Sequence, residues 1–243
     1  MTISVIIPTR NEEKLLRGCL EQFPVEFKQE FGIEIIVSDG GSSDATFAIA
    51  SGYADRIVTH NDSSHRQTIG EGRNRGAAIA SGDIFVFLNA DTRIPDIANF
   101  FERIRNRMSS NLSIVAVSGK VKVLPEERTL TDVIFHAYFN NYIQLINFIG
   151  IGMGRGECQI IRSSAFNELE GYNESLAAGE DFELFNRLKK TGKVLFDTKL
   201  LVYESPRRYR KFGYSKVYFD WVKNGFSVIF KKRSSSEIWE EVR

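Results

Sequence analysis

Cysteine is scarce in this chain, with only Cys19 and Cys158 among 243 residues. Two thiols cannot build a disulfide framework or a metal knuckle, so we expect both to be buried thiols in a reducing compartment. The chain also lacks a run of about 18 uninterrupted apolar residues, which argues against a membrane-spanning helix. The residues after Met1 do not form a basic segment that leads into an apolar stretch, so we expect no signal peptide. These absences predict a cytoplasmic protein.

An excess of charge of one sign is also missing, because the formal net charge is +1. This balance argues against a general nucleic-acid-binding protein. The charge is uneven, however. Residues 207–243 contain ten Lys and Arg against four Asp and Glu, a local charge of +6, which leaves −5 for the other 206 residues. The basic segment predicts an anionic partner nearby, such as phosphates, a membrane surface or an acidic subunit.

Short apolar strands alternate with helical segments along the first half of the chain. Strands are predicted at 3–7, 33–38, 57–58, 84–88, 114–117 and 120–124. Between them, helices are predicted from a capping box at Thr9 to Glu12, around Phe47, at 73–81 and at 96–108. This order predicts one α/β domain, a three-layer α/β/α sandwich with a mostly parallel sheet. Ligands of such sheets lie beyond the carboxyl ends of the strands, where we expect Pro8, Asp39 and Asp91 to converge.

The second half contains fewer strand signals. A strand at 159–161, a helix at 163–169 and a helix from 180 to Gly192 are predicted. Glycines alternate at 150, 152, 154 and 156, which fits either a flexible loop beside the acceptor or a tight packing corner. No Gly-x-Gly-x-x-Gly follows the first strand, so a dinucleotide dehydrogenase is excluded. No Walker A sequence occurs either. The three histidines, His60, His65 and His136, lack metal-ligand spacing, and surface or core roles are expected for them.

Five segments form a recognisable order along the chain. They are VIIPTRNE at 5–12, VSDGGSSD at 37–44, GRNRG at 72–76, FLNAD at 87–91 and GEDFEL at 179–184, the last followed by Arg187 and Leu188. Over residues 1–205 the chain therefore resembles family 2 glycosyltransferases of the GT-A fold. Each motif alone is weak, but five in this order and spacing are specific.

The resemblance implies a site for a nucleoside diphosphate sugar in the first half. Pro8, Thr9, Arg10 and Glu12 would lie beside the base and ribose, and Arg73 would face the diphosphate. Asp39 would accept an N–H of uracil or guanine, with the Gly40 backbone close to the ligand. The alternative for Asp39 is a plain turn or helix-capping carboxylate.

The resemblance also implies a metal site and a general base. Asn89, Ala90 and Asp91 occupy the position of the Asp-x-Asp motif, so Asp91 would bind Mg²⁺ or Mn²⁺ beside the diphosphate. This sequence departs from the family by having Asn89 first and by lacking a His after the late strand, where Glu204 stands. Asp181 would be the base of an inverting transfer, with Glu180 beside it near the acceptor. Alternatively, both carboxylates only complement a helix dipole.

Two aromatic-rich segments are predicted to lie on the acceptor side. The first carries a polar stripe at Asp132, His136, Asn140, Gln144 and Asn147 on an otherwise apolar helix. The second, the C-terminal extension at 206–243, is amphipathic and is bracketed by basic runs at 207–211 and 231–233. It fits an interfacial membrane helix, a dimerisation helix or a helix packed on its own domain. Arg207 and Arg208 are predicted to contact the diphosphate or a phosphorylated acceptor.

The predicted function is transfer of a sugar from a nucleoside diphosphate sugar to an acceptor hydroxyl, which is lipid-linked or part of a saccharide. The predicted protein is cytoplasmic, and it is peripheral at the inner membrane face if the C-terminal helix is an interfacial membrane helix. One alternative is a non-catalytic homologue or subunit that only binds the nucleotide sugar. Another is a sugar-phosphate nucleotidyltransferase, but that class expects a glycine-rich loop with a basic residue after the first strand. This chain has Pro8 to Glu12 there.

Overall fold

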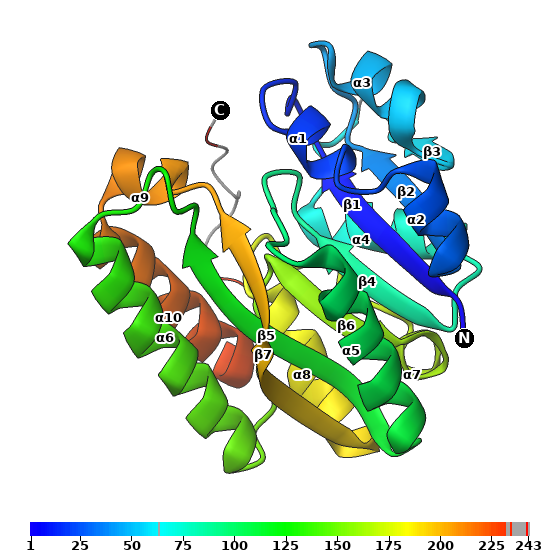
Figure 1. The fold of residues 1–243 in the computed structure, drawn as a ribbon. Helices are drawn as coiled ribbons and strands as arrows, with labels where there is room; N and C mark the ends of the chain where they lie inside the picture. The colour runs from blue at the N-terminus through cyan, green and yellow to red at the C-terminus, as the bar shows by residue number, and fades with distance from the viewer. Residues whose placement is uncertain (63, 232–233, 235–241, 243) are drawn as a thin grey trace.

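The computed structural model describes residues 1–62, 64–231, 234 and 242 (Figure 1). Within them, one seven-stranded sheet has the order β3-β2-β1-β4-β6-β5-β7. The strands are β1 (Ile3–Thr9), β2 (Ile33–Asp39), β3 (Arg56–Thr59), β4 (Ile84–Leu88), β5 (Ile114–Val123), β6 (Cys158–Arg162) and β7 (Lys193–Glu204). β6 runs antiparallel to both of its neighbours, and the other pairs are parallel. The predicted mostly parallel α/β sheet is confirmed.

Helices cover both faces of this sheet. One face packs against α1 (Leu16–Leu20), α2 (Val25–Glu30), α3 (Thr46–Tyr53) and α5 (Ile97–Ser110), and the other against α4 (Ile69–Ala78), α7 (Ser163–Glu168) and α8 (Glu180–Thr191). Strand side chains alternate between the two cores, as the two-residue period requires. In β4, for example, Val86 and Leu88 join the α5 side, while Phe85 and Phe87 join the α7 side.

Three predicted boundaries were wrong. The capping box at Thr9 does not begin a helix, because Thr9 still belongs to β1, Asn11 turns the chain with φ of 52°, and α1 begins only at Leu16. The helix predicted from Arg73 begins earlier, since Thr68 caps α4 by accepting from the Glu71 amide. The two strands predicted at 114–124 are one strand, β5, with a register shift beside Gly119.

Three further helices lie beyond β5 and β7. They are α6 (Leu130–Phe148), α9 (Arg207–Phe212) and α10 (Tyr214–Lys231). Aromatic rings join α6 to α10, with Phe139 and Trp221 at 5.0 Å between centroids and the hydroxyls of Tyr138 and Tyr218 at 3.2 Å. Of the predicted C-terminal extension, the helices at 207–231 therefore pack on the domain, whereas the basic residues Lys232 and Arg233 lie outside the described part of the chain.

The polar stripe of α6 faces inward, apart from Gln144, which is exposed. Asn140 exchanges two hydrogen bonds with the Val121 backbone, and Asn147 does the same with the backbone of Met153. The opposite face is apolar and exposed, with Ile134 at 62% and Phe148 at 87%. Its buried face therefore combines polar side chains bonded to backbone groups with the apolar Phe139 and Ile143, while a second apolar face is exposed.

The alternating glycines form a packing corner, one of the two predicted options. A Cβ on Gly154 would lie 2.6 Å from the Phe185 ring, and one on Gly152 would lie 2.5 Å from the Phe185 carbonyl oxygen. Gly152 also has φ of 84°, a conformation that favours glycine. Cys19 and Cys158 are buried free thiols, as expected. Among the described helices, none has the length and hydropathy needed to cross a bilayer.

Candidate active site

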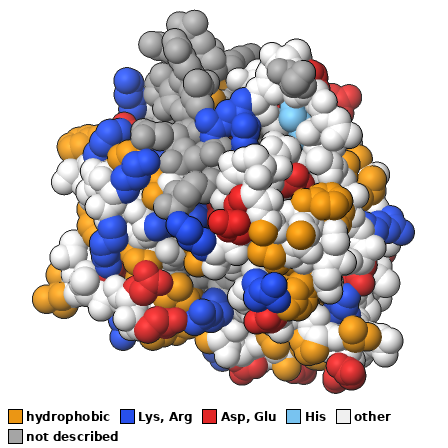
Figure 2. Space-filling view, turned by 90° about the horizontal axis from the view of Figure 1, so that it is seen from above, with side chains coloured by type: hydrophobic (Ala, Val, Ile, Leu, Met, Phe, Trp, Pro, Cys, Tyr) orange, Lys and Arg blue, Asp and Glu red, His pale blue; other side chains and the backbone are white. Residues whose placement is uncertain are grey.

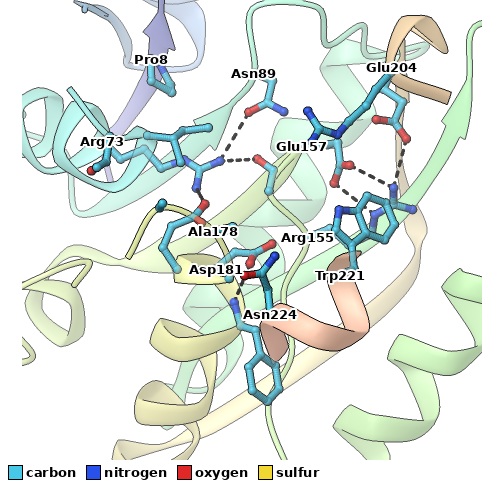
Figure 3. Close-up of a pocket in the computed structure, with 18 of the residues that line it drawn as sticks. Pro8, Arg73, Asn89, Arg155, Glu157, Ala178, Asp181, Glu204, Trp221 and Asn224 are labelled. Carbon is cyan, nitrogen blue, oxygen red and sulfur yellow. Dashed lines mark hydrogen bonds and ion pairs between the residues drawn. The ribbon is translucent and has the colours of Figure 1, made fainter. Parts of the chain in front are cut away.

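A cavity of about 460 Å³ lies beyond the carboxyl ends of β1 and β4, between α4, α8 and α10 (Figure 3). Thirteen of the fourteen predicted site residues line it, and the exception is Asp39. The lining residues are Pro8, Thr9, Arg10, Glu12, Gly40, Arg73, Asn89, Ala90, Asp91, Glu180, Asp181, Arg207 and Arg208. Motifs separated by up to 200 positions therefore meet in one place, as the strand-end argument predicts.

The segment after β1 forms one wall of the cavity. The Glu12 amide donates to the Thr46 hydroxyl at 2.7 Å, which fixes the chain after the turn at Asn11. The Glu12 carboxylate accepts two hydrogen bonds from the Arg207 guanidinium, at 2.8 and 2.9 Å. This bidentate pair attaches the start of α9 to the β1 end of the cavity.

Asp39 lies behind the wall instead of in it. Its side chain is buried and accepts hydrogen bonds from the backbone amide and hydroxyl of Ser42. Thr9 donates to the same carboxylate at 3.4 Å. These contacts are those of the turn carboxylate that the sequence left as an alternative, and a base contact by Asp39 stays a prediction.

Gln67 is a better-placed polar group that the sequence did not indicate. Its Oε1 lies 2.9 Å from the position that a Cβ on Gly40 would occupy, so a larger residue at Gly40 would displace the Gln67 side chain. The Gln67 side-chain nitrogen is buried and has no hydrogen-bond partner among the described residues. Because a buried donor without a partner is costly, this amide is well suited to a ligand that enters the cavity.

Asp91 follows β4 and lies against a cation. The Arg207 guanidinium is 3.4 Å from its Oδ2. Burial raises the pKa of Asp91 to about 6, against the opposing effect of Arg207 and with a further contribution from the charge of Glu12. The Asp91 carboxylate is therefore poorly solvated and responds strongly to nearby positive charge.

Arg73 lies in the cavity wall with its guanidinium fully buried. It donates to the Glu180 carboxylate at 2.7 Å, to the Gly156 carbonyl at 2.8 Å and to the Asn89 side-chain oxygen at 3.4 Å (Figure 3). The guanidinium therefore connects α4, the end of β4, the glycine-rich segment and the start of α8.

Asp181 lies in the first turn of α8, immediately beside this network. The helix begins after Gly179, whose φ of 83° permits the sharp approach of the chain. The Asp181 carboxylate is partly accessible and accepts from the Phe182 amide at 2.8 Å. Burial and then the charge of Glu180 raise the pKa of Asp181 to about 7. A carboxylate with such a pKa can accept a proton near neutral pH.

A second buried charge cluster was missed by the sequence analysis. Arg155 donates to Glu157 at 3.1 Å and to Glu204 at 3.0 Å, and the Tyr209 hydroxyl donates to Glu204 at 2.9 Å (Figure 3). Burial and the charge of Glu157 raise the pKa of Glu204. Arg155 lies within the glycine-rich segment and Glu157 directly follows it, and this segment was interpreted only as a loop or packing corner. The charged pair at the end of this segment was the available signal.

Aromatic side chains form the far side of the cavity. Phe139 and Tyr142 come from α6, and Tyr218 and Trp221 come from α10, together with the aliphatic Val222. In Figure 3, Trp221 lies beside Arg155, and Asn224 lies beside Asp181. The cavity therefore has a polar half at the strand ends and an aromatic half between the two outer helices.

Curated relatives match about a third of the chain. A PGL/p-HBAD biosynthesis glycosyltransferase of Mycobacterium bovis is 36% identical over 92 residues, which are 36% of this chain and 34% of that protein. A validoxylamine A glucosyltransferase of Streptomyces hygroscopicus is 34% identical over 91 residues, 36% of this chain and 20% of that protein. The matched stretch thus spans about a third of the length of these relatives or less.

Solved structures share the fold over nearly the whole chain. The mannosyltransferase PcManGT from Pyrobaculum calidifontis, in complex with GDP-Man and Mn²⁺, aligns with a TM-score of 0.69 at 15% identity, covering 99% of this chain and 65% of that one. Glucosyl-3-phosphoglycerate synthase from Mycobacterium tuberculosis, in complex with Mn²⁺, UDP-glucose and phosphoglyceric acid, aligns with a TM-score of 0.63 at 18% identity, covering 95% and 79%. The family model for glycosyl transferase family 2 matches residues 4–170, and the chain belongs to this family.

Proposed function

We propose that this protein transfers a sugar from a nucleoside diphosphate sugar to an acceptor hydroxyl, with inversion at the anomeric carbon. The observation that carries the proposal is the position of Asp181, between the polar and the aromatic halves of one cavity. A donor in the polar half and an acceptor in the aromatic half would meet at this carboxylate. Asp181 would take the proton of the acceptor hydroxyl, and the nucleotide would leave on the opposite face of the sugar.

Family membership and the binding of nucleotide sugars by structural neighbours support the donor half. We propose that Pro8, Thr9 and Gln67 lie beside the base and that Arg207 and Arg208 lie near the diphosphate. The Arg73 guanidinium is fully buried and donates to Glu180, Gly156 and Asn89. We therefore assign Arg73 to positioning α8 instead of binding phosphate, whereas the Arg207 side chain is partly exposed. Glu180, which Arg73 holds, would stay beside the acceptor without accepting its proton.

The donor set at Asp91 fits a hard divalent cation. Asp91 offers a carboxylate, and the Asn89 amide oxygen, which accepts only a long hydrogen bond of 3.4 Å from Arg73, offers a second oxygen of the kind that Mg²⁺ and Mn²⁺ prefer. When bound, the cation would neutralise charge on the departing nucleotide. Glu204 does not replace the missing His ligand readily, because its carboxylate is bonded to Arg155 and Tyr209.

Calorimetric titration of UDP-, GDP- and dTDP-sugars tests the donor site, first with Mn²⁺ and then with EDTA. We expect saturable binding of one nucleotide, weakened by EDTA and lost in Asp91→Ala. In Asp39→Ala, weaker donor binding at unchanged stability would support a base contact, whereas a loss of stability would support a turn role. Absence of binding by every donor would contradict the proposal. Sugar transfer, or slow hydrolysis of the donor, would exclude a non-catalytic homologue, and release of pyrophosphate would indicate a nucleotidyltransferase instead.

For the acceptor we propose a lipid-linked hydroxyl that enters beside α6 and α10 from an anionic membrane surface, at the inner face. Exposed apolar side chains on these helices are Leu130, Ile134, Tyr138, Leu145, Phe148 and Phe219. Figure 2 shows Lys and Arg side chains among hydrophobic ones on the side of α6, α9 and α10. Apolar side chains beside basic ones match the chemistry of an anionic bilayer surface.

Vesicle sedimentation tests this acceptor side. Binding to phosphatidylcholine vesicles should increase when phosphatidylglycerol is added and should weaken with salt. Phe148→Ser and Ile134→Ser should reduce binding, whereas Leu112→Ser, an exposed position on the turn before β5, should not. A protein that dimerises through α6 and ignores vesicles would replace the membrane proposal with a homodimer.

A further inference from the structure

Two histidines that are distant from any metal motif in the sequence meet around one glutamate. His60 follows β3, His65 lies in the loop that leads to α4, and Glu71 lies in the first turn of α4. One ligand atom from each residue lies within 4.8 Å of the other two. The sequence spacing of these histidines predicted only surface or core roles for them. The loop between β3 and α4 folds back, however, and brings both imidazoles to Glu71.

Each imidazole has its outer nitrogen fixed by an oxygen. The His60 Nε2 lies 3.2 Å from the His65 carbonyl, which can only accept, so this nitrogen carries the hydrogen. The His65 Nδ1 lies 3.4 Å from the Asp62 carboxylate. Both contacts leave the inner nitrogens, His60 Nδ1 and His65 Nε2, directed at Glu71. This pattern, in which an oxygen orients a ligand histidine through its second nitrogen, is characteristic of metal sites.

The inner nitrogen of His60 supplies an independent observation. The residue is 7% exposed, and its Nδ1 has no hydrogen-bond partner within the described ranges. It lies 3.6 Å from Glu71 Oε1, so a neutral imidazole would direct its lone pair at a carboxylate oxygen. That arrangement is unfavourable unless the nitrogen binds a cation or a proton.

We propose that His60 Nδ1, His65 Nε2 and the Glu71 carboxylate bind one zinc-class divalent ion. Two imidazoles and one carboxylate suit Zn²⁺, whose bonds of about 2.0 Å place tetrahedral ligands roughly 3.3 Å apart. The His65 Nε2 and Glu71 Oε2 atoms, which share a hydrogen bond without the ion, lie 3.0 Å apart, close to that spacing. Arg75 donates to Glu71 Oε1 and leaves Oε2 for the ion, and water would complete the fourth position.

The site would order a segment of the donor cavity. The loop between His60 and Glu71 carries Arg66 and Gln67, which both line the cavity. An ion bound at the start, middle and end of this segment would hold Gln67 beside Gly40. This role is separate from the proposed metal at Asp91, and it stands whether or not the protein transfers sugar.

Calorimetry with Zn²⁺ alone tests the proposal on tag-free, chelator-treated protein without nucleotide. We expect one saturable Zn²⁺ event that is weakened at least about 10-fold in His65→Ala, an exposed position whose replacement should not disturb folding. The same event should persist in Asp91→Asn, which separates it from the donor metal. Zinc binding that is equal in wild type and His65→Ala, or that is lost only in Asp91→Asn, would overturn the proposal.

Imidazole nitrogen NMR provides a second measurement that does not depend on a variant. The chain has three histidines, so the spectrum contains three rings. Zn²⁺ should move the Nδ1 resonance of His60 and the Nε2 resonance of His65 and leave His136 unchanged. If Zn²⁺ moves none of them, the cluster is an ion pair between protonated histidine and Glu71, and the proposal is wrong.

Discussion

The Arg73 guanidinium donates to the Glu180 carboxylate at 2.7 Å across 107 positions of the chain, and both side chains are buried. Glu180 directly precedes the proposed base, so this pair fixes the start of α8 relative to the strand ends. It also brings a buried negative charge beside Asp181, which is one cause of the raised pKa of that carboxyl. The pair thus has a structural and an electrostatic effect on the same residue.

Removing Arg73 should therefore destabilise the protein strongly. Arg73→Ala leaves Glu180 buried without a counter-charge, and we expect a loss of about 3–5 kcal/mol in the free energy of unfolding. Arg75→Ala, in the same helix but partly exposed, should cost only about 0–1 kcal/mol. Urea unfolding of both variants checks the difference, and similar losses in the two would show that the buried pair is not special.

Asp181→Asn should reduce kcat by about 10²–10⁴-fold with little change in donor affinity, because only proton acceptance is lost. In the wild type, the rate should rise with pH through about 7, where Asp181 loses its proton. Initial rates across pH, together with donor titration of the variant, check both statements. A variant that retains full turnover would move the base to another residue.

The same substitution should change the pH dependence of stability. The pKa of Asp181 is about 7 in the folded protein against 3.8 for the ordinary group, so the folded state binds more protons between these values. Stability should therefore fall as pH rises from about 4 to about 7, and this fall should be smaller in Asp181→Asn. Thermal melting should show the variant more stable than the wild type at about pH 8 but similar at about pH 4.

Asp197→Asn is the matched control, with the opposite sign. Although burial opposes the effect, Arg103 and Arg107 lower the pKa of Asp197. Its contribution is present at neutral pH and is lost as pH falls through the lowered pKa, so Asp197→Asn should destabilise the protein most at neutral pH. The same sign in both variants would contradict the electrostatic assignment.

Gly154 should not tolerate a methyl group. Gly154→Ala would place a Cβ 2.6 Å from the Phe185 ring, and we expect a loss of about 1–3 kcal/mol from overpacking. Gly52→Ala, in α3 with no atom within 4 Å of the added Cβ, should gain about 0.4–1 kcal/mol instead. Chemical denaturation of the two variants checks this contrast, and equal effects would indicate that the glycine corner is loosely packed.

Arg207→Ala should weaken donor binding and alter the metal dependence. The variant removes the cation beside Asp91 and Glu12, so the pKa of Asp91 should rise further above its value of about 6. Donor titrations at several Mn²⁺ concentrations should show lower donor affinity and a greater requirement for the ion, because the ion becomes the remaining cation at Asp91. Unchanged titrations in Arg207→Ala and Arg208→Ala would exclude these residues from the donor site.

Sequence patterns predicted the parts of the site that lie at strand ends. Pro8, Asn89 and Asp91 follow apolar strands, and parallel pairing brings them to one edge. Sequence patterns did not predict contacts between segments that are distant in the sequence and meet only in the folded structure. The Arg155 cluster, the buried nitrogen of Gln67 and the meeting of His60 with Glu71 each join segments with no shared periodicity. The capping box at Thr9 misled because Thr9 is still paired in β1 and the chain turns at Asn11, so that tertiary pairing overrode a local signal.

On α6, the hydropathy of a residue does not by itself indicate how strongly the fold constrains it. Its polar residues, such as Asn140 and Asn147, are bonded to backbone groups inside the domain, whereas Ile134 and Phe148 contact little of it. In a mutational scan, the fold should accept serine at the exposed hydrophobic positions, but not at the buried Phe139 and Ile143, and should reject alanine at the buried polar positions. Hydrophobic residues that persist on this surface in evolution would therefore record selection by whatever the helix meets outside the molecule.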